Sequence, residues 1–110
     1  MVRIFVYTSS FRKTWEAMGL SDNELPILEN ALLKNPKLGN VIEGTGGARK
    51  IRIQLNSGRG KSGGGRVIYI DFVEKERIYF LLAYPKNKQA NLTNEQKKMI
   101  RNIISEIKRE

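Results

Sequence analysis

The sequence contains no cysteine and no histidine. Without cysteine the chain can form no disulfide and no thiolate, which agrees with a cytoplasmic protein. Without histidine it lacks the usual acid–base side chain of neutral pH and the commonest metal ligand. We therefore expect no metal site and no cofactor, and any catalysis must come from other side chains.

Long hydrophobic runs are also absent. No apolar stretch approaches the roughly 20 residues that cross a bilayer, and the N-terminal MVRIFVYTSS lacks the core and cleavage site of a secretory signal. We expect a cytoplasmic protein with no membrane partner. The 110 residues, of which 40% are hydrophobic, fit a single domain, 1–110, with one modest core.

Negative charge is scarce in the second part of the chain. Twenty Lys and Arg residues stand against 11 Asp and Glu residues, so the formal net charge is +9. Residues 1–48 hold five of each sign, and residues 49–110 hold fifteen bases and six acids. A surplus confined to one region indicates a binding face for a polyanion, although a solvated face without a partner is the plain alternative.

The most basic stretch, residues 44–70, reads GTGGARKIRIQLNSGRGKSGGGRVIYI and contains no acid. It holds eight of the ten glycines and six bases: Arg49, Lys50, Arg52, Arg59, Lys61 and Arg66. Glycine lets a phosphate backbone approach closely, and Lys and Arg neutralise it. The stretch therefore indicates a nucleic-acid partner. Its Gly60-Lys61-Ser62 is not a nucleotide-binding loop, because the preceding glycine and the following helix of that motif are missing.

Residue periodicity predicts the order strand, helix, helix, three strands, helix. The expected strands are Arg3–Tyr7, Lys50–Leu55, Arg66–Val73 and Arg77–Tyr84, the last two forming a hairpin around a charged turn at Glu74–Glu76. The first expected helix is Phe11–Met18, with Ser9 or Ser10 as its N-cap. The second begins at the capping box of Ser21 and Glu24 and ends at Asn35-Pro36. The third begins at Thr93, which forms a capping box with Gln96. Leu38–Glu43 is expected to be a short connection. This order favours an α+β fold: a small antiparallel sheet with two N-terminal helices and a C-terminal helix.

The last helix carries an apolar stripe at helical spacing. Its members are Met99, Ile100, Ile103, Ile104 and Ile107. Such a stripe fits packing against the sheet, which we favour, or a partner-binding surface.

RNA cleavage is one reaction that needs neither metal nor histidine, because the 2′-hydroxyl is a nucleophile beside the scissile phosphate. A protein accelerates it by neutralising the charge of the transition state and by assisting proton transfer. Arg and Lys supply charge, and a Tyr, or a Lys whose pKa neighbouring cations lower, can move protons. Lys50 and Arg52 share a strand face, Arg66 opens the next strand and Tyr84 ends the third, so the sheet can bring them together. Each of these residues alone could equally be structural.

The chain resembles the RelE/ParE superfamily of bacterial toxins, and within it the HigB-like branch of type II toxin–antitoxin systems. The matching segments are NPKLGNVIEGTGGARKIRI, GKSGGGRVIYI and LLAYPKN, and the resemblance covers nearly the whole chain. It implies a compact sheet with helices on one side. It also implies a metal-independent endoribonuclease that cleaves mRNA on the ribosome and so inhibits translation.

The same resemblance implies a set of partners. They are the mRNA, the ribosome and a cognate helix-turn-helix antitoxin of the HigA-like type that neutralises the toxin. Operator DNA would be bound only through the antitoxin.

The resemblance also implies which residues act. The catalytic residues would be Lys50, Arg52, Arg66, Lys86 and Asn87, and the residues expected to contact RNA are Arg49, Arg59, Lys61, Tyr84 and Lys88. Asn87 stands where some relatives have an arginine, and no tyrosine follows Tyr84, so the identity of the general acid and base stays open.

Two other functions stay open at this point. One is a non-catalytic ParE-like toxin that inhibits a partner such as DNA gyrase, and the other is a simple RNA-binding module. The convergence of Lys50, Arg52 and Arg66 argues against the gyrase inhibitor, because such a protein needs no phosphate site.

Overall fold

The computed structural model describes residues 2–54 and 64–110. The strands are β1 (Ile4–Tyr7), β2 (Asn40–Val41), β3 (Arg49–Ile53), β4 (Gly65–Phe72) and β5 (Arg77–Pro85). The α-helices are α1 (Ser9–Ala17), α2 (Leu25–Lys34) and α3 (Asn94–Arg109), and two short 3-10 turns are η1 (Asp22–Glu24) and η2 (Val73–Lys75). This confirms the α+β class and the predicted order of the main elements.

The strands form one five-stranded sheet in the order β1-β5-β4-β3-β2. β1 is parallel to β5, and the other neighbours are antiparallel, including the predicted β4–β5 hairpin. β2 lies in Leu38–Glu43, where the sequence predicted only a connection. A strand of two residues is too short to show any alternation, so periodicity could not reveal it.

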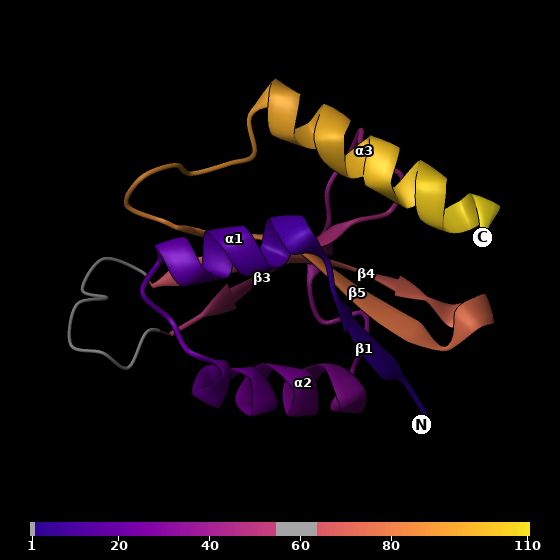
Figure 1. Ribbon diagram of the computed structural model, residues 1–110, viewed down its shortest axis with the longest axis horizontal. Coiled ribbons are helices and arrows are strands. Elements are labelled where there is room, and N and C mark those ends of the chain that lie inside the picture. The colour runs from indigo at the N-terminus through magenta and orange to yellow at the C-terminus, as the bar shows by residue number, and fades with distance from the viewer. Residues whose placement is uncertain (1, 55–63) are drawn as a thin grey trace.

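Helices cover both faces of the sheet. Val67 and Tyr69 of β4 belong to a core formed with α1 and α2, whereas Ile68 and Ile70 belong to a second core that includes α3. Figure 1 accordingly shows α2 and α3 on opposite sides of the sheet. The implied arrangement with helices on one side of the sheet is therefore wrong. β4 and β5 carry buried side chains on both faces of the sheet, so helices must pack against each face.

A register shift in β5 decides which side chains meet at the end of the sheet. Ile68 pairs with Leu82 but Tyr69 pairs with Phe80, so Leu81 is an additional residue in β5. Leu81 and Leu82 consequently both belong to the α3 core. The shift also places Tyr84 on the α3 face, opposite Arg66.

Local capping explains where the helices begin. The N-cap of α1 is Thr8, whose Oγ1 accepts from Phe11 N at 3.2 Å, so the prediction of Ser9 or Ser10 is wrong by one or two positions. Both predicted capping boxes, Ser21–Glu24 and Thr93–Gln96, are confirmed.

The stripe of α3 packs against the sheet as favoured. Its buried members are Ile100, Ile104 and Ile107. Across the residues that the structure describes, no helix combines the length and the apolar character needed to cross a membrane.

Candidate functional site

A row of polar side chains crosses three strands at one end of the sheet. Arg52 of β3 pairs with Arg66 of β4, which in turn pairs with Tyr84 of β5. Directly opposite residues project from the same face with Cβ atoms roughly 5 Å apart, and like charges in that position are destabilising. The sheet therefore places two cationic side chains opposite each other, an arrangement suited to binding an anion.

Lys50 joins this row in an open hollow of about 520 Å³, which we call the basic pocket. Its lining residues are Leu38, Asn40, Lys50, Ile51, Arg52, Arg66 and Ala90. The Lys50 Nζ donates to Asn91 Oδ1 at 3.3 Å and so connects β3 to the loop before α3. The structure thus brings together three of the five residues that the sequence analysis named as catalytic, and Lys50 and Arg52 share a strand face as predicted.

Arg66 lies deepest among the cations of the pocket. Arg66 is 6% exposed, and its Nη1 donates to the carbonyl of Gly65 at 3.1 Å. Lys50 is half-buried and Arg52 is exposed. A guanidinium held in a largely dehydrated position is suited to stabilising charge that develops on a phosphate, because it interacts more strongly there than in water.

Tyr84 is buried next to Arg66. Only 4% of it is exposed, and its hydroxyl makes no hydrogen bond within residues 2–54 and 64–110. Burial raises the pKa of Tyr84, an effect that the charge of Arg66 partly offsets. The phenol is thus neutral at physiological pH, and its ring is too covered to stack on an RNA base without local rearrangement.

The turn after β5 lies next to the start of β4, close in the sheet to the row formed by Arg52, Arg66 and Tyr84. Lys86 N donates to Gly64 O at 3.0 Å and Lys88 N donates to Pro85 O at 3.1 Å, which holds the turn beside the start of β4. Lys86, Asn87 and Lys88 are all exposed. The turn therefore lies beside the start of β4. The loop residues Ala90 and Asn91, which no sequence pattern indicated, join the site at the pocket lining and at Lys50 respectively.

Arg49 faces the other way. It pairs with Tyr69, on the α1–α2 face, and its Nη1 donates to the carbonyls of Gly39 at 2.7 Å and Lys37 at 3.3 Å. We therefore assign Arg49 to holding the segment before β2, and not to the RNA contact that the sequence analysis expected. The alternation of side chains along β3 already indicates this orientation, because residue 49 lies on the same face of the strand as Ile51 and on the opposite face from Lys50.

Arg59 and Lys61, two further residues expected to contact RNA, lie outside the described residues, as does Leu55 at the end of the predicted strand. Among the described residues, no group of three or more acidic side chains is arranged to hold a metal ion. The polar side chains that line the basic pocket are three cations, Lys50, Arg52 and Arg66, and the amide of Asn40.

The sequence matches a known protein family, and the fold is similar to those of solved structures. A family model described as "RelE toxin of RelE / RelB toxin-antitoxin system" matches residues 2–109. A mutant of the E. coli toxin RelE in the free state is 18% identical, with a TM-score of 0.56, over 82% of this chain and 90% of that one. The isolated E. coli RelE toxin is 17% identical, with a TM-score of 0.55, over 92% and 98%.

The intact E. coli RelBE toxin–antitoxin complex contains a chain that is 20% identical, with a TM-score of 0.52, over 74% of this chain and 93% of that one. At these identities the solved structures show a shared fold. The matching family is that of RelE, so the narrower assignment to the HigB-like branch is not confirmed.

Proposed function

Because the chain belongs to the RelE toxin family, we propose that it is the toxin of a type II toxin–antitoxin system and acts as an endoribonuclease that cleaves mRNA on the ribosome. The observation that carries the cleavage proposal is the convergence of Lys50, Arg52 and Arg66 in the basic pocket. A protein that only inhibits an enzyme such as gyrase has no need for a dehydrated arginine at a phosphate site.

The proposed reaction uses the RNA's own nucleophile. The 2′-oxygen loses its proton and attacks the adjacent phosphorus, and the bond to the 5′-oxygen breaks as that oxygen gains a proton. The products are a 2′,3′-cyclic phosphate and a 5′-hydroxyl. Arg66 and Arg52 stabilise the additional negative charge on the phosphate oxygens, and a single well-placed donor of this kind contributes about 3 kcal/mol in comparable sites.

Proton transfer is assigned to the lysines at the edges of the pocket. Lys50 lies beside Arg52 on β3, and Lys86 lies on the turn that contacts Gly64. Asn87, on the same turn, offers an amide that orients the nucleotide. The neutral Tyr84 hydroxyl, buried beside Arg66, can donate to a phosphate oxygen that Arg66 binds once a local rearrangement exposes it. Lys88 extends the cationic surface for the RNA backbone.

We propose that an antitoxin neutralises the toxin, because the RelE of E. coli is known in a complex with RelB. The helix-turn-helix type of that antitoxin, and operator binding through it, stay predictions from the sequence. We further propose that residues 1–110 act as one toxin domain, with the mRNA and the ribosome as its substrate assembly.

The substitution Arg66→Ala tests the proposal directly. We expect it to abolish growth inhibition when the chain is expressed in a bacterial host without antitoxin, because the best-placed phosphate cation is lost. Colony counts after induction measure the effect. Binding of the variant to the antitoxin, measured by calorimetry, should stay within about threefold of the parent and so shows that the fold is intact.

Arg109→Ala is the matched control. Arg109 is exposed on α3 and pairs with Glu106, far along the chain from the basic pocket. This variant should be as toxic as the parent. An Arg66→Ala variant that still stops growth would remove Arg66 from the site, and a parent chain that never stops growth would refute the toxin assignment.

A further inference from the structure

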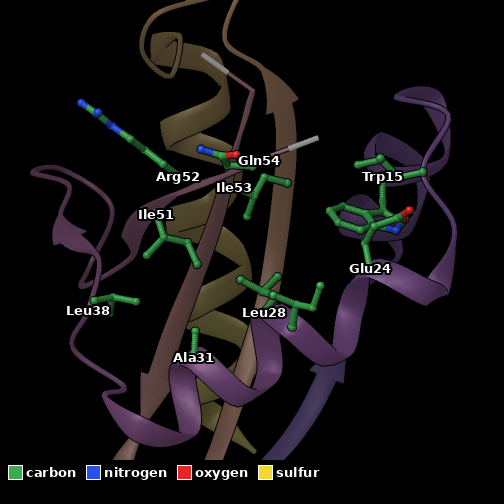
Figure 2. A pocket seen from close by; sticks show the side chains of 11 residues that line it. Trp15, Glu24, Leu28, Ala31, Leu38, Ile51, Arg52, Ile53 and Gln54 are labelled. Atoms are coloured by element: carbon green, nitrogen blue, oxygen red, sulfur yellow. The ribbon is translucent and has the colours of Figure 1, made fainter. Parts of the chain in front are cut away.

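Lys50 lies on the cationic face of β3. Figure 2 shows the other face of this strand, where Ile51 and Ile53 line an apolar hollow of about 230 Å³ together with Leu28 of α2, and where Arg52 extends away from these side chains. Lys50 precedes Arg52 by two positions and so shares its face, and both line the basic pocket. The contacts that fix the Lys50 ammonium must therefore come from elements on the side of the basic pocket.

The ammonium of Lys50 can serve the reaction only if its position is defined. Lysine carries a compact charge on a flexible four-carbon stem, so an unrestrained ammonium samples many positions. A proton moves only over hydrogen-bond distance, and a displacement of about 1 Å at a reacting group can cost about 100-fold in rate. Lys50 Nζ donates to Asn91 Oδ1 at 3.3 Å, across to the loop that precedes α3. This contact restricts where the ammonium lies.

Asn91 is itself held by the start of α3. Its carbonyl accepts from Gln89 Nε2 at 2.9 Å, and the Gln89 and Gln96 side chains donate to each other at 2.8 and 3.4 Å. Gln96 is fixed in turn, because it closes the capping box of Thr93. Leu92, the residue after Asn91, is 8% exposed and belongs to the α3 core. Asn91 therefore lies on a loop that is anchored to α3 on both sides of it.

An amide suits this position better than a carboxylate. Among the residues that the structure describes, no acid lines the basic pocket. A carboxylate beside Lys50 would pair with the ammonium and repel the RNA phosphate. The amide oxygen of Asn91 accepts a hydrogen bond from the ammonium and adds no charge. The pocket thus combines a positioned lysine with a positive potential that is not offset by a neighbouring acid.

We propose that Asn91 is a positioning residue, which holds the Lys50 ammonium in place for proton transfer with the RNA in the basic pocket. This inference rests on the proposed function, in which Lys50 moves a proton. Asn91 acts through Lys50 and does not contact the reacting atoms of the RNA. Through the Gln89–Gln96 pair, α3 contributes to the geometry of the site as well as to the core.

The test compares side chains of similar size at position 91. Asn91→Leu removes the hydrogen-bond acceptor, whereas Asn91→Asp keeps one. Single-turnover cleavage of mRNA on translating ribosomes, at a series of toxin concentrations, gives a maximal rate and a half-saturating concentration. We expect Asn91→Leu to lower the maximal rate about tenfold at an unchanged half-saturating concentration. Asn91→Asp should keep the maximal rate within about threefold of the parent but require about threefold more toxin, because its charge opposes the RNA phosphates.

A double-mutant cycle shows whether Asn91 acts through Lys50. In a Lys50→Met background, Asn91→Leu should cost less than about twofold in the maximal rate, because the group that Asn91 positions is gone. A tenfold loss in both backgrounds would show that Asn91 acts elsewhere and would overturn the proposal. So would a maximal rate of Asn91→Leu equal to that of the parent, or an Asn91→Asp variant as slow as Asn91→Leu.

Asn102→Leu is the matched control. Asn102 is exposed further along α3 and does not line the basic pocket, so the same substitution there should leave cleavage unchanged. Both leucine variants should keep the urea midpoint of the parent, because both positions are exposed. A slow Asn91→Leu variant whose urea midpoint also falls and whose half-saturating concentration rises would give Asn91 a merely structural role and contradict the proposal. A parent chain that cleaves no mRNA would instead refute the proposed function itself.

Discussion

Tyr84 carries a buried hydroxyl that makes no hydrogen bond within the described residues. A buried, unsatisfied hydroxyl costs about 1 kcal/mol or more. We infer that its use lies in the reaction, beside Arg66. Tyr84→Phe should therefore raise the free energy of unfolding by about 1 kcal/mol and lower the rate of RNA cleavage by about tenfold or more.

Urea unfolding and a single-turnover cleavage assay measure these two effects. The opposite signs matter, because a merely structural tyrosine would change stability and activity in the same direction. A variant that cleaves RNA at the parent rate would leave the Tyr84 hydroxyl without a role.

In contrast to Tyr84, Tyr69 has a buried hydroxyl that both donates and accepts a hydrogen bond. It donates to Pro36 O at 2.7 Å and accepts from Gly39 N at 3.0 Å, and so fixes the segment that supplies Leu38 to both hollows. Tyr69→Phe should lower the free energy of unfolding at pH 7 by about 1–3 kcal/mol, because a buried carbonyl and a buried N–H lose their partner.

The pH dependence of Tyr69 has a defined sign. Burial raises the pKa of Tyr69 in the folded chain, whereas a tyrosine in an unfolded chain has a pKa of about 10. Its contribution to stability is therefore complete below about pH 10 and is lost as the pH rises through the raised pKa of the folded state. The difference in stability between the parent and Tyr69→Phe should shrink above pH 10 in urea titrations, and a constant difference would contradict this account.

At the scale of elements, capping accounts for helix starts that propensity alone leaves open. Thr93 Oγ1 accepts from Gln96 N at 3.0 Å, and Gln96 Oε1 accepts from Thr93 N at 3.0 Å. Thr93→Ala removes one half of this box and should lower the free energy of unfolding by about 1 kcal/mol. Asn94→Ala, at the next exposed position, should have a smaller effect. Equal melting temperatures for the two variants would show that the box does not stabilise α3.

The sequence could predict those elements whose pattern is local. Alternation in Lys50–Leu55 and the stripe of α3 depend on neighbouring residues, and both predictions hold for the described residues. The parallel pairing of β1 with β5 and the bulge at Leu81 depend on contacts between distant segments, which no window of sequence contains. The same limit applies to the site: Asn91 reaches Lys50 only because the chain returns after β5.

At the scale of the whole molecule, the basic residues discussed above fall into two groups: cations of the proposed binding face and cations that stabilise the fold. Lys50, Arg52, Arg66, Lys86 and Lys88 surround the basic pocket or its neighbouring turn, whereas Arg49 and Arg3 serve the fold, the latter through an ion pair with Asp71 at 2.7 Å. The overall charge of the sequence therefore overstates the number of phosphates that the site can neutralise.

Salt titration can count those phosphates. For single-stranded RNA, the five cations named above, counted among residues 2–54 and 64–110, predict a log–log slope of about −3.5 for binding of a 2′-O-methylated RNA, which cannot be cleaved. Arg49→Ala should leave the slope unchanged, because Arg49 lies on the other face of β3. A flat salt dependence would show that the basic pocket does not bind the RNA backbone.

Toeprinting of mRNA on translating ribosomes tests the central claim most directly. If the basic pocket is a ribonuclease site, the parent chain will produce cuts in phase with the codons at the ribosomal A site, and Arg66→Ala will produce none at equal occupancy. Intact mRNA in the presence of the parent chain, together with growth arrest through DNA damage, would contradict the account and favour an inhibitor of a DNA enzyme.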